Sequence, residues 1–137
     1  MPYVFKTEPD VYSFADLERD RETVWDGVAN PQAVKYLREM QPGEQVAIYH
    51  SGEERAVVGT AEVLAVDARD PKVPLVRIRR GMSVPRKSLA AIKREPLFKD
   101  SPLVRQSRLS VVPLTPEQFR WLTDMESQRQ EKNLKST

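Results

Sequence analysis

The chain has 137 residues, of which 39% are hydrophobic and 31% charged, with a net charge of +2. This length fits one domain with one core. The absence of cysteine excludes disulfides and cysteine-based metal sites, and a single histidine, His50, excludes a multi-histidine centre within one chain. No apolar run approaches the ~18 residues of a membrane span, and the amino terminus lacks a signal-peptide pattern. We therefore expect a soluble cytoplasmic protein, nuclear if the source is eukaryotic, with no membrane contact.

The first third of the chain predicts short elements separated by caps and turns. An apolar, aromatic stretch predicts a strand over 3–6, and Ser13 with Asp16 forms a capping-box pattern that starts a helix to about residue 19. Residues 23–25 have an extended pattern. Asn30 before a proline then predicts a helix that ends near residue 41, because asparagine caps helices and proline suits the first helical position.

The rest of the chain alternates strands with short helices. Gly59 lies inside a β-branched run, which indicates a bulge or a close backbone approach. The last helix is expected to begin near residue 115 and to carry Phe119, Leu122 and Met125 on one face. The other predicted elements are strands over 44–51, 56–66, 75–80 and 109–113, and a helix over 88–94.

These five or six strands and three or four helices lack the regular spacing of βαβ units. The pattern therefore predicts an α+β fold around a strongly curved mixed sheet, or a small barrel, with short flanking helices. The polar composition of the last residues divides the chain into a domain over 1–126 and a tail over 127–137.

Charge is unevenly distributed. Residues 1–70 hold 7 Lys and Arg against 14 Asp and Glu, whereas residues 71–108 hold 11 against 2. One interpretation is a basic stripe that faces phosphates. The other is a solvated face whose basic side chains lie over the acidic half of the same fold.

Two stretches carry candidate chemistry, although no serine-triad spacing and no glycine-rich phosphate loop is present. Lys6, Thr7 and Glu8 end the first strand, where the carboxylate could accept from a base amino group. Trp25 precedes a turn that leads to Asn30, and its ring could stack on a base. The alternatives are a solvated loop for the first stretch, and a core tryptophan with a helix cap for the second.

Five motifs in order resemble the EVE domain, a member of the PUA-like superfamily, from about residue 3 to residue 121. Their segments are Phe5–Pro9, Val24–Val28 with Asn30, Tyr49–Ser51, Val58–Val63 and Val104–Val111. The resemblance implies a compact curved sheet and a pocket for a single nucleobase, chiefly a modified cytosine. It implies no enzyme activity, no cofactor and no metal, and a nucleic-acid partner, DNA or RNA.

Carried over by position, the resemblance implies roles for twelve residues. Trp25 is an aromatic wall; Asp26, Asn30, Thr7 and Glu8 meet the base edge; and Tyr49 and Ser51 line the floor. Lys6, Arg105, Gln106, Ser107 and Arg108 contact the phosphates. Related readers often close the pocket with a second aromatic from a later loop, but residues 80–85 hold none. Met82 could replace it as a softer wall; the alternative is a pocket that is open on that side.

A competing hypothesis is a small-molecule amidohydrolase of acylated cytidine. Some PUA-like relatives of the ASCH group resemble such enzymes. Lys6 would activate the Thr7 hydroxyl, with Glu8 or Glu62 assisting. Adjacent residues on a strand point to opposite faces, so this role needs the strand to end before Thr7. A third possibility, a protein-interaction module, has no positive support in the sequence.

Overall fold

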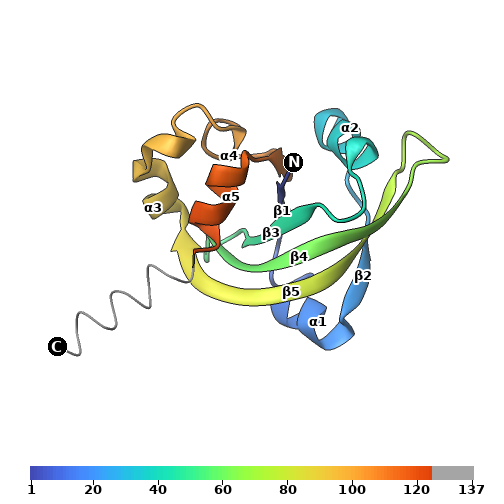
Figure 1. Cartoon of the computed structure of the whole chain (residues 1–137), viewed down its shortest axis with the longest axis horizontal. Coiled ribbons are helices and arrows are strands. Elements are labelled where there is room, and N and C mark those ends of the chain that lie inside the picture. The colour runs from blue at the N-terminus through green and yellow to red at the C-terminus, as the bar shows by residue number, and fades with distance from the viewer. Residues whose placement is uncertain (125–137) are drawn as a thin grey trace.

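The computed structural model describes residues 1–124 (Figure 1). Its strands are β1 (Tyr3–Thr7), β2 (Glu22–Trp25), β3 (Gln45–His50), β4 (Ala56–Asp67), β5 (Leu75–Ser88) and β6 (Val111–Pro113). They form one sheet in the order β2-β5-β4-β3-β1-β6, in which β1 and β3 are parallel and the other neighbours antiparallel. β2 and β6 remain the edges, so the expected α+β fold with a curved mixed sheet is confirmed as an open sheet.

Short helices flank this sheet. They are α1 (Phe14–Asp20), α2 (Pro31–Glu39), α3 (Leu89–Arg94), the 3₁₀ turn η1 (Pro96–Phe98), α4 (Pro102–Arg105) and α5 (Pro116–Leu122). Figure 1 shows α3, α4 and α5 gathered at one end of the long curved strands β4 and β5, with α1 and α2 toward the other. Within residues 1–124, no helix combines the length and the hydrophobicity that crossing a membrane requires.

The predicted helix caps, and the bulge or close backbone approach predicted at Gly59, are confirmed. The Ser13 hydroxyl accepts from the Asp16 amide, and the Asp16 carboxylate accepts from the Ser13 amide. The β4 register shifts on both sides of Gly59. A Cβ added there would clash with the Phe14 ring, so Gly59 allows both the irregularity and the close packing of α1.

Two predictions differ from the structure or fall outside it, and two short elements were not predicted. β5 continues to Ser88, well past the expected end at residue 80, because residues 81–88 keep pairing with β4 across shifts in register. Between α3 and β6 the structure also contains η1 and α4, each with proline at its start, and neither was predicted. Met125 and the tail over 127–137 lie outside the described residues.

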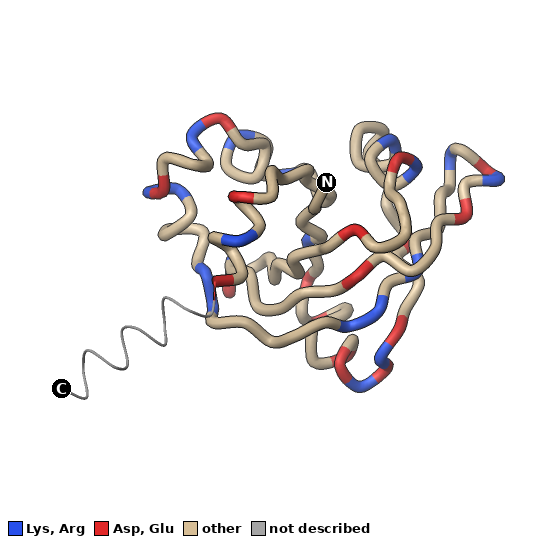
Figure 2. The backbone as a smooth tube through the Cα atoms, in the orientation of Figure 1, with Lys and Arg blue, Asp and Glu red and all other residues tan. Residues whose placement is uncertain are grey.

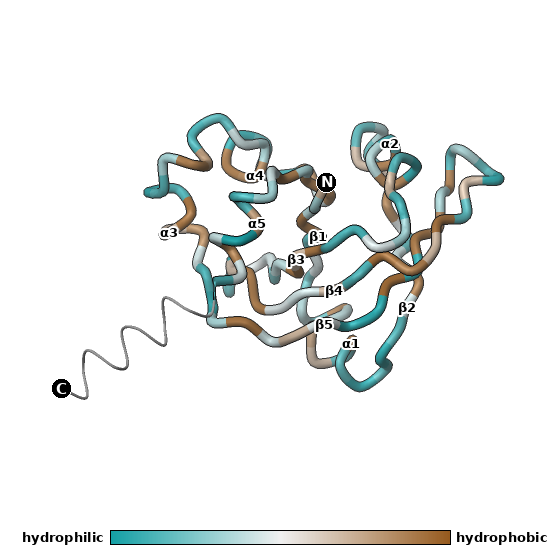
Figure 3. Tube along the Cα trace, in the orientation of Figure 1, coloured by the Kyte–Doolittle hydropathy of each residue, from teal (hydrophilic) through white to brown (hydrophobic). Residues whose placement is uncertain are grey.

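The core fills the inside of the curve. Residues Val46–His50 of β3 are buried on both strand faces, because the sheet has chain packed on each side of this strand. β5 instead alternates buried and exposed residues over its first half, and Figure 3 shows the corresponding hydrophobic and hydrophilic stretches. The curvature also brings the edge strand β2 across to β1, although three strands separate them in the sheet: the Phe5 and Trp25 ring centroids are 5.0 Å apart.

The positive charge of residues 71–108 is partly neutralised by acidic side chains of residues 1–70. Three ion pairs connect them: Arg77–Glu22 at 3.9 Å, Arg79–Glu62 at 2.7 Å and Arg86–Glu54 at 2.6 Å. Figure 2 shows basic positions of β5 beside acidic positions of β2 and β4. For these arginines the structure therefore supports the second interpretation of the charge pattern.

Candidate functional site

A cavity of about 640 Å³ opens where β1 and β2 end. This volume falls within the roughly 300–1,000 Å³ of small-ligand sites. Its walls come from residues 6–8, 11–12 and 23–29, together with Ser110. We call it the Trp25 cavity. It unites the two stretches that the sequence indicated separately, the end of the first strand and the segment after the tryptophan.

Trp25 belongs to both the core and the cavity wall. Its side chain is buried, with 9% of the residue exposed. The Phe5 ring packs against it, and the Tyr12 ring meets it nearly edge-on, with centroids 6.2 Å apart and planes at 85°. These contacts fix the indole orientation before any ligand enters, which is the arrangement that stacking requires.

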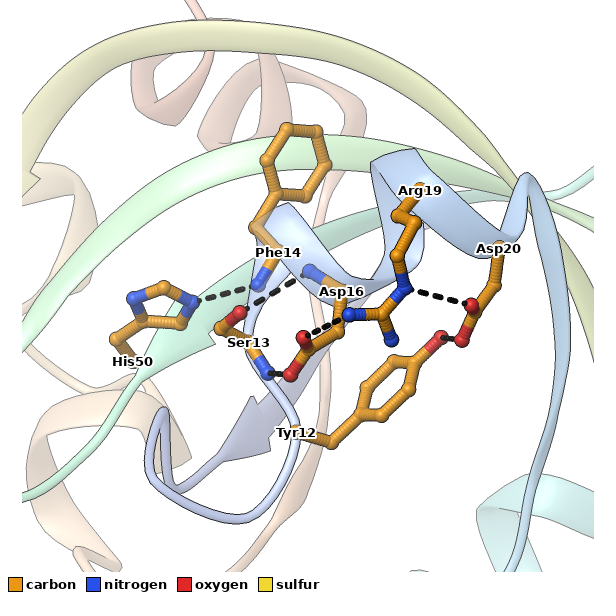
Figure 4. Close-up of polar contacts among 7 residues, drawn as sticks. All are labelled: Tyr12, Ser13, Phe14, Asp16, Arg19, Asp20 and His50. Atoms are coloured by element: carbon orange, nitrogen blue, oxygen red, sulfur yellow. Dashed lines mark hydrogen bonds and ion pairs between the residues drawn. The ribbon is translucent and has the colours of Figure 1, made fainter.

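Tyr12 is the second aromatic of this cavity, and sequence reasoning missed it. The loop after β1 folds back tightly: the Glu8 carbonyl accepts from the Tyr12 amide, and the Thr7 hydroxyl donates to the Tyr12 carbonyl. Figure 4 shows the Tyr12 hydroxyl donating to Asp20 at 3.0 Å. Partial burial, aided by the Asp20 charge, raises the pKa of the Tyr12 phenol, so it stays protonated at neutral pH.

The expected replacement wall, Met82, is wrong. Met82 lies within β5, not in a loop, and its amide donates to the Thr60 hydroxyl. It is 61% exposed and does not line the Trp25 cavity. The second aromatic instead comes from the loop between β1 and α1.

Residues 26–29 form a strip of backbone along the cavity. Gly27 has a φ of 72°, the left-handed region that glycine adopts without strain, and it turns the chain after β2. Within residues 1–124, the amides of Gly27, Val28 and Ala29 donate no hydrogen bond to the protein. They can therefore donate to a ligand at this wall.

Three predicted edge residues line the Trp25 cavity. Glu8 and Asp26 are exposed carboxylates at its wall. Thr7 also lines it, but its hydroxyl proton is committed to the Tyr12 carbonyl at 2.7 Å, so toward a ligand Thr7 can only accept. Asn30 is not among the lining residues, because its side-chain oxygen accepts from the Gln32 and Ala33 amides as the cap of α2.

Tyr49 and Ser51, expected on the floor, line a neighbouring cavity of about 430 Å³, which we call the Tyr49 cavity. Lys6 lines both cavities. Its ammonium donates to the Ser107 carbonyl at 3.1 Å and lies 5.6 Å from the Tyr49 ring centroid. Burial lowers the pKa of Lys6.

The predicted phosphate residues divide in the structure. Ser107 lines the Tyr49 cavity, whereas Arg105, Gln106 and Arg108 are exposed and line neither cavity. Arg105 ends α4, and its guanidinium donates to the Lys99 carbonyl and contacts the Asp100 carboxylate at 3.5 Å. Arg105 therefore does not line the Trp25 cavity, and its contact with a phosphate stays a prediction.

The arrangement does not favour hydrolase chemistry. The strand continues through Thr7, and the two groups that would have to cooperate point to different partners: Lys6 to the Ser107 carbonyl and Thr7 to the Tyr12 carbonyl. Glu62 pairs with Arg79 on the neighbouring strand and lies outside both cavities.

Solved structures with the same fold come from bacteria and from humans. A protein from Rhodopseudomonas palustris is 30% identical with a TM-score of 0.83 and coverage of 93% of both chains. Human thymocyte nuclear protein 1, solved in complex with DNA that contains 5-methylcytosine, is 25% identical with a TM-score of 0.80, over 91% of this chain and 96% of that one. An ASCH protein from Zymomonas mobilis, at 13% identity and a TM-score of 0.61, shares the fold alone.

Two curated relatives are similar to the chain in sequence. Thymocyte nuclear protein 1 of Danio rerio is 32% identical over 133 residues; the match covers 76% of this chain and 58% of that protein's length. The Gallus gallus protein of the same name is 27% identical, with 93% of this chain and 69% of that protein covered. The EVE domain matches residues 2–125, nearly the whole described structure, and the chain belongs to the EVE-domain family.

Proposed function

We propose that the chain is a nucleic-acid-binding module that holds one flipped or unpaired modified base, a cytosine derivative, in the Trp25 cavity. The observation that carries this proposal is the combination of two aromatic walls, Trp25 and Tyr12, with two exposed carboxylates, Glu8 and Asp26. The complex of the human relative with DNA that contains 5-methylcytosine supports the same class of ligand. The polymer is DNA or RNA.

The lining groups match the edge of cytosine. A carboxylate accepts from the exocyclic amino group of cytosine but repels the carbonyl oxygen that thymine and uracil carry at that position. The free amides of residues 27–29 can donate to the remaining acceptors of the base. Base stacking on an aromatic ring contributes about 1–3 kcal/mol, which offsets the few kcal/mol of unstacking.

Apolar side chains provide for the modification. Val11 and Val28 line the Trp25 cavity, and Val11 is strongly exposed. Burial of a methyl group contributes only about 1 kcal/mol, so preference for the modified base depends on the shape of the cavity as well as on apolar contact.

The test is binding of single-stranded oligonucleotides that differ at one central base: 5-methylcytosine, cytosine or thymine. We expect the highest affinity for 5-methylcytosine, a lower affinity for cytosine and the lowest for thymine. Asp26→Asn should raise affinity for thymine, because the repulsion of its carbonyl oxygen is lost, and should therefore narrow the ratio between cytosine and thymine. Asp10→Asn is the matched control, an exposed aspartate outside the cavity, and should leave that ratio unchanged. Equal affinity of the wild-type protein for the three oligonucleotides would overturn the proposal.

A further inference from the structure

The Tyr49 cavity adjoins the Trp25 cavity and shares the wall residue Lys6. Lys6 of β1 is the register partner of Tyr49 on β3, so adjacent parallel strands deliver both side chains to this place. The far wall comes from the loop after β3, with Arg55, and from the last turn of α3, with Lys93.

This cavity is lined by three cations and no carboxylate. Within residues 1–124, Lys6, Arg55 and Lys93 form no ion pair with an acidic side chain; Arg55 donates only to the Gly52 carbonyl at 3.1 Å. Arg77 and Arg79 of β5 differ from these three cations, because each of them pairs with a glutamate. The Tyr49 cavity therefore holds positive charge that the fold leaves uncompensated, as an anion site does.

The Tyr49 hydroxyl points to the same conclusion independently. Tyr49 is only 4% exposed, yet within the described residues its hydroxyl makes no hydrogen bond. No fully buried side-chain polar atom of the described residues lacks a partner, so the small exposed part of Tyr49 includes this oxygen, at the cavity that the residue lines. Burial raises the pKa of the phenol, and the nearby Arg55 opposes this only in part, so the hydroxyl is a donor at neutral pH.

We propose that the Tyr49 cavity binds one phosphodiester group of the strand whose modified base occupies the Trp25 cavity, through Lys6, Arg55, Lys93 and the Tyr49 hydroxyl. The inference rests on the proposed function and adds Arg55 and Lys93 to the interface. The arginine fork and the two ammonium groups suit phosphate oxygens. Lys6, common to both cavities, sets the spacing between the held base and the held phosphate.

The first experiment compares Lys93→Gln with Lys35→Gln, an exposed lysine of α2 outside both cavities. Both variants lose one positive charge. We expect Lys93→Gln to weaken binding of the 5-methylcytosine oligonucleotide about tenfold and to reduce the slope of log K against log salt by about one. The preference for 5-methylcytosine over cytosine should stay as in the wild type. Lys35→Gln should change affinity less than about twofold.

The second experiment replaces each phosphate near the 5-methylcytosine, one at a time, by a neutral methylphosphonate. In the wild type and in Lys35→Gln, one linkage should give the largest loss. In Lys93→Gln and in Tyr49→Phe, which keeps the buried ring, that same replacement should cost less affinity than in the wild type, because one of the four partners of that phosphate is already missing.

Two outcomes separate this inference from the proposed function. If the wild type binds and discriminates, but Lys93→Gln behaves as Lys35→Gln does and no linkage loses its effect in either cavity variant, the phosphate site is overturned while the base site stands. If the wild type does not prefer the modified base, yet one linkage couples to Lys93 and Tyr49, the phosphate site stands and the base assignment fails.

Discussion

His50 Nε2 accepts a hydrogen bond from the Phe14 backbone amide at 2.9 Å, across 36 positions of sequence (Figure 4). The other ring nitrogen lies 2.9 Å from the Glu54 carboxylate. Because Nε2 accepts, Nδ1 carries the proton and donates to Glu54. This single histidine therefore holds the start of α1, and with it the loop that presents Tyr12 to the Trp25 cavity.

Replacing this histidine should destabilise the fold. His50→Ala leaves the buried Phe14 amide without its acceptor and opens a void, so we expect the free energy of unfolding to fall by about 2–3 kcal/mol. Urea denaturation measures it, and Glu53→Ala, at an exposed position of the same turn, is the control. A loss as small as that of the control would show that the contact to Phe14 contributes little.

Trp25→Ala should cost about 3–5 kcal/mol of stability, because it removes a large core ring from its packing on Phe5. Loss of binding in that variant would therefore be ambiguous. A better reporter is Trp121→Phe, which leaves Trp25 as the sole tryptophan, since the chain has two. In this background we expect the 5-methylcytosine oligonucleotide to quench the remaining fluorescence by stacking. Unchanged emission at saturating ligand would contradict contact between base and indole.

Lys6→Met should make the protein more stable and a weaker binder. Burial lowers the pKa of Lys6, so the folded state disfavours the charged form and Lys6 reduces stability at neutral pH. The unfolded chain binds more protons than the folded chain between the lowered pKa and the ordinary value of 10.5, and wild-type stability rises with pH across that interval.

The stability advantage of Lys6→Met should accordingly be largest near pH 7 and shrink toward pH 10.5, as measured by urea denaturation at a series of pH values. Lys35→Met, with an exposed ammonium, provides the comparison. An advantage that is independent of pH would mean that packing of the methionine, and not removal of the buried charge, causes it.

Gly59→Ala should destabilise the fold by about 1–3 kcal/mol through overpacking, since the new Cβ would press on the Phe14 ring. Phe14→Leu in the same chain should recover part of this loss. A double-mutant cycle by thermal denaturation measures the coupling. Strict additivity of the two substitutions would show that the backbone of β4, and not the ring, limits this position.

Helix caps and the β-bulge were predictable from sequence, whereas contacts between residues distant in sequence were not. Caps and bulges depend on a few adjacent residues, so the sequence around each position was enough to predict the roles of Ser13, Asn30 and Gly59. Tyr12 was missed because its place in the cavity depends on a loop that folds back onto Thr7, and spacing alone does not reveal that fold.

The charge pattern did not reveal which cations are paired, for a related reason. Arg105 looked available in sequence, but its partner Asp100 and the Lys99 carbonyl become neighbours only when α4 forms. Arg55 and Lys93 looked unremarkable, and only the tertiary fold places them around Tyr49. Which cations remain unpaired depends on strand register and helix placement, and neither follows from composition.

The pairing of β1 with β6 has a consequence for how the protein is made. The Lys6 amide donates to the Ser110 carbonyl, and both residues line the Trp25 cavity, although they lie far apart in the sequence. Closing such a long loop is entropically costly and slow. During translation β1 therefore lacks one of its two neighbours until β6 has been made, and we expect the nascent chain to bind ligand only after residues 111–113 have left the exit tunnel.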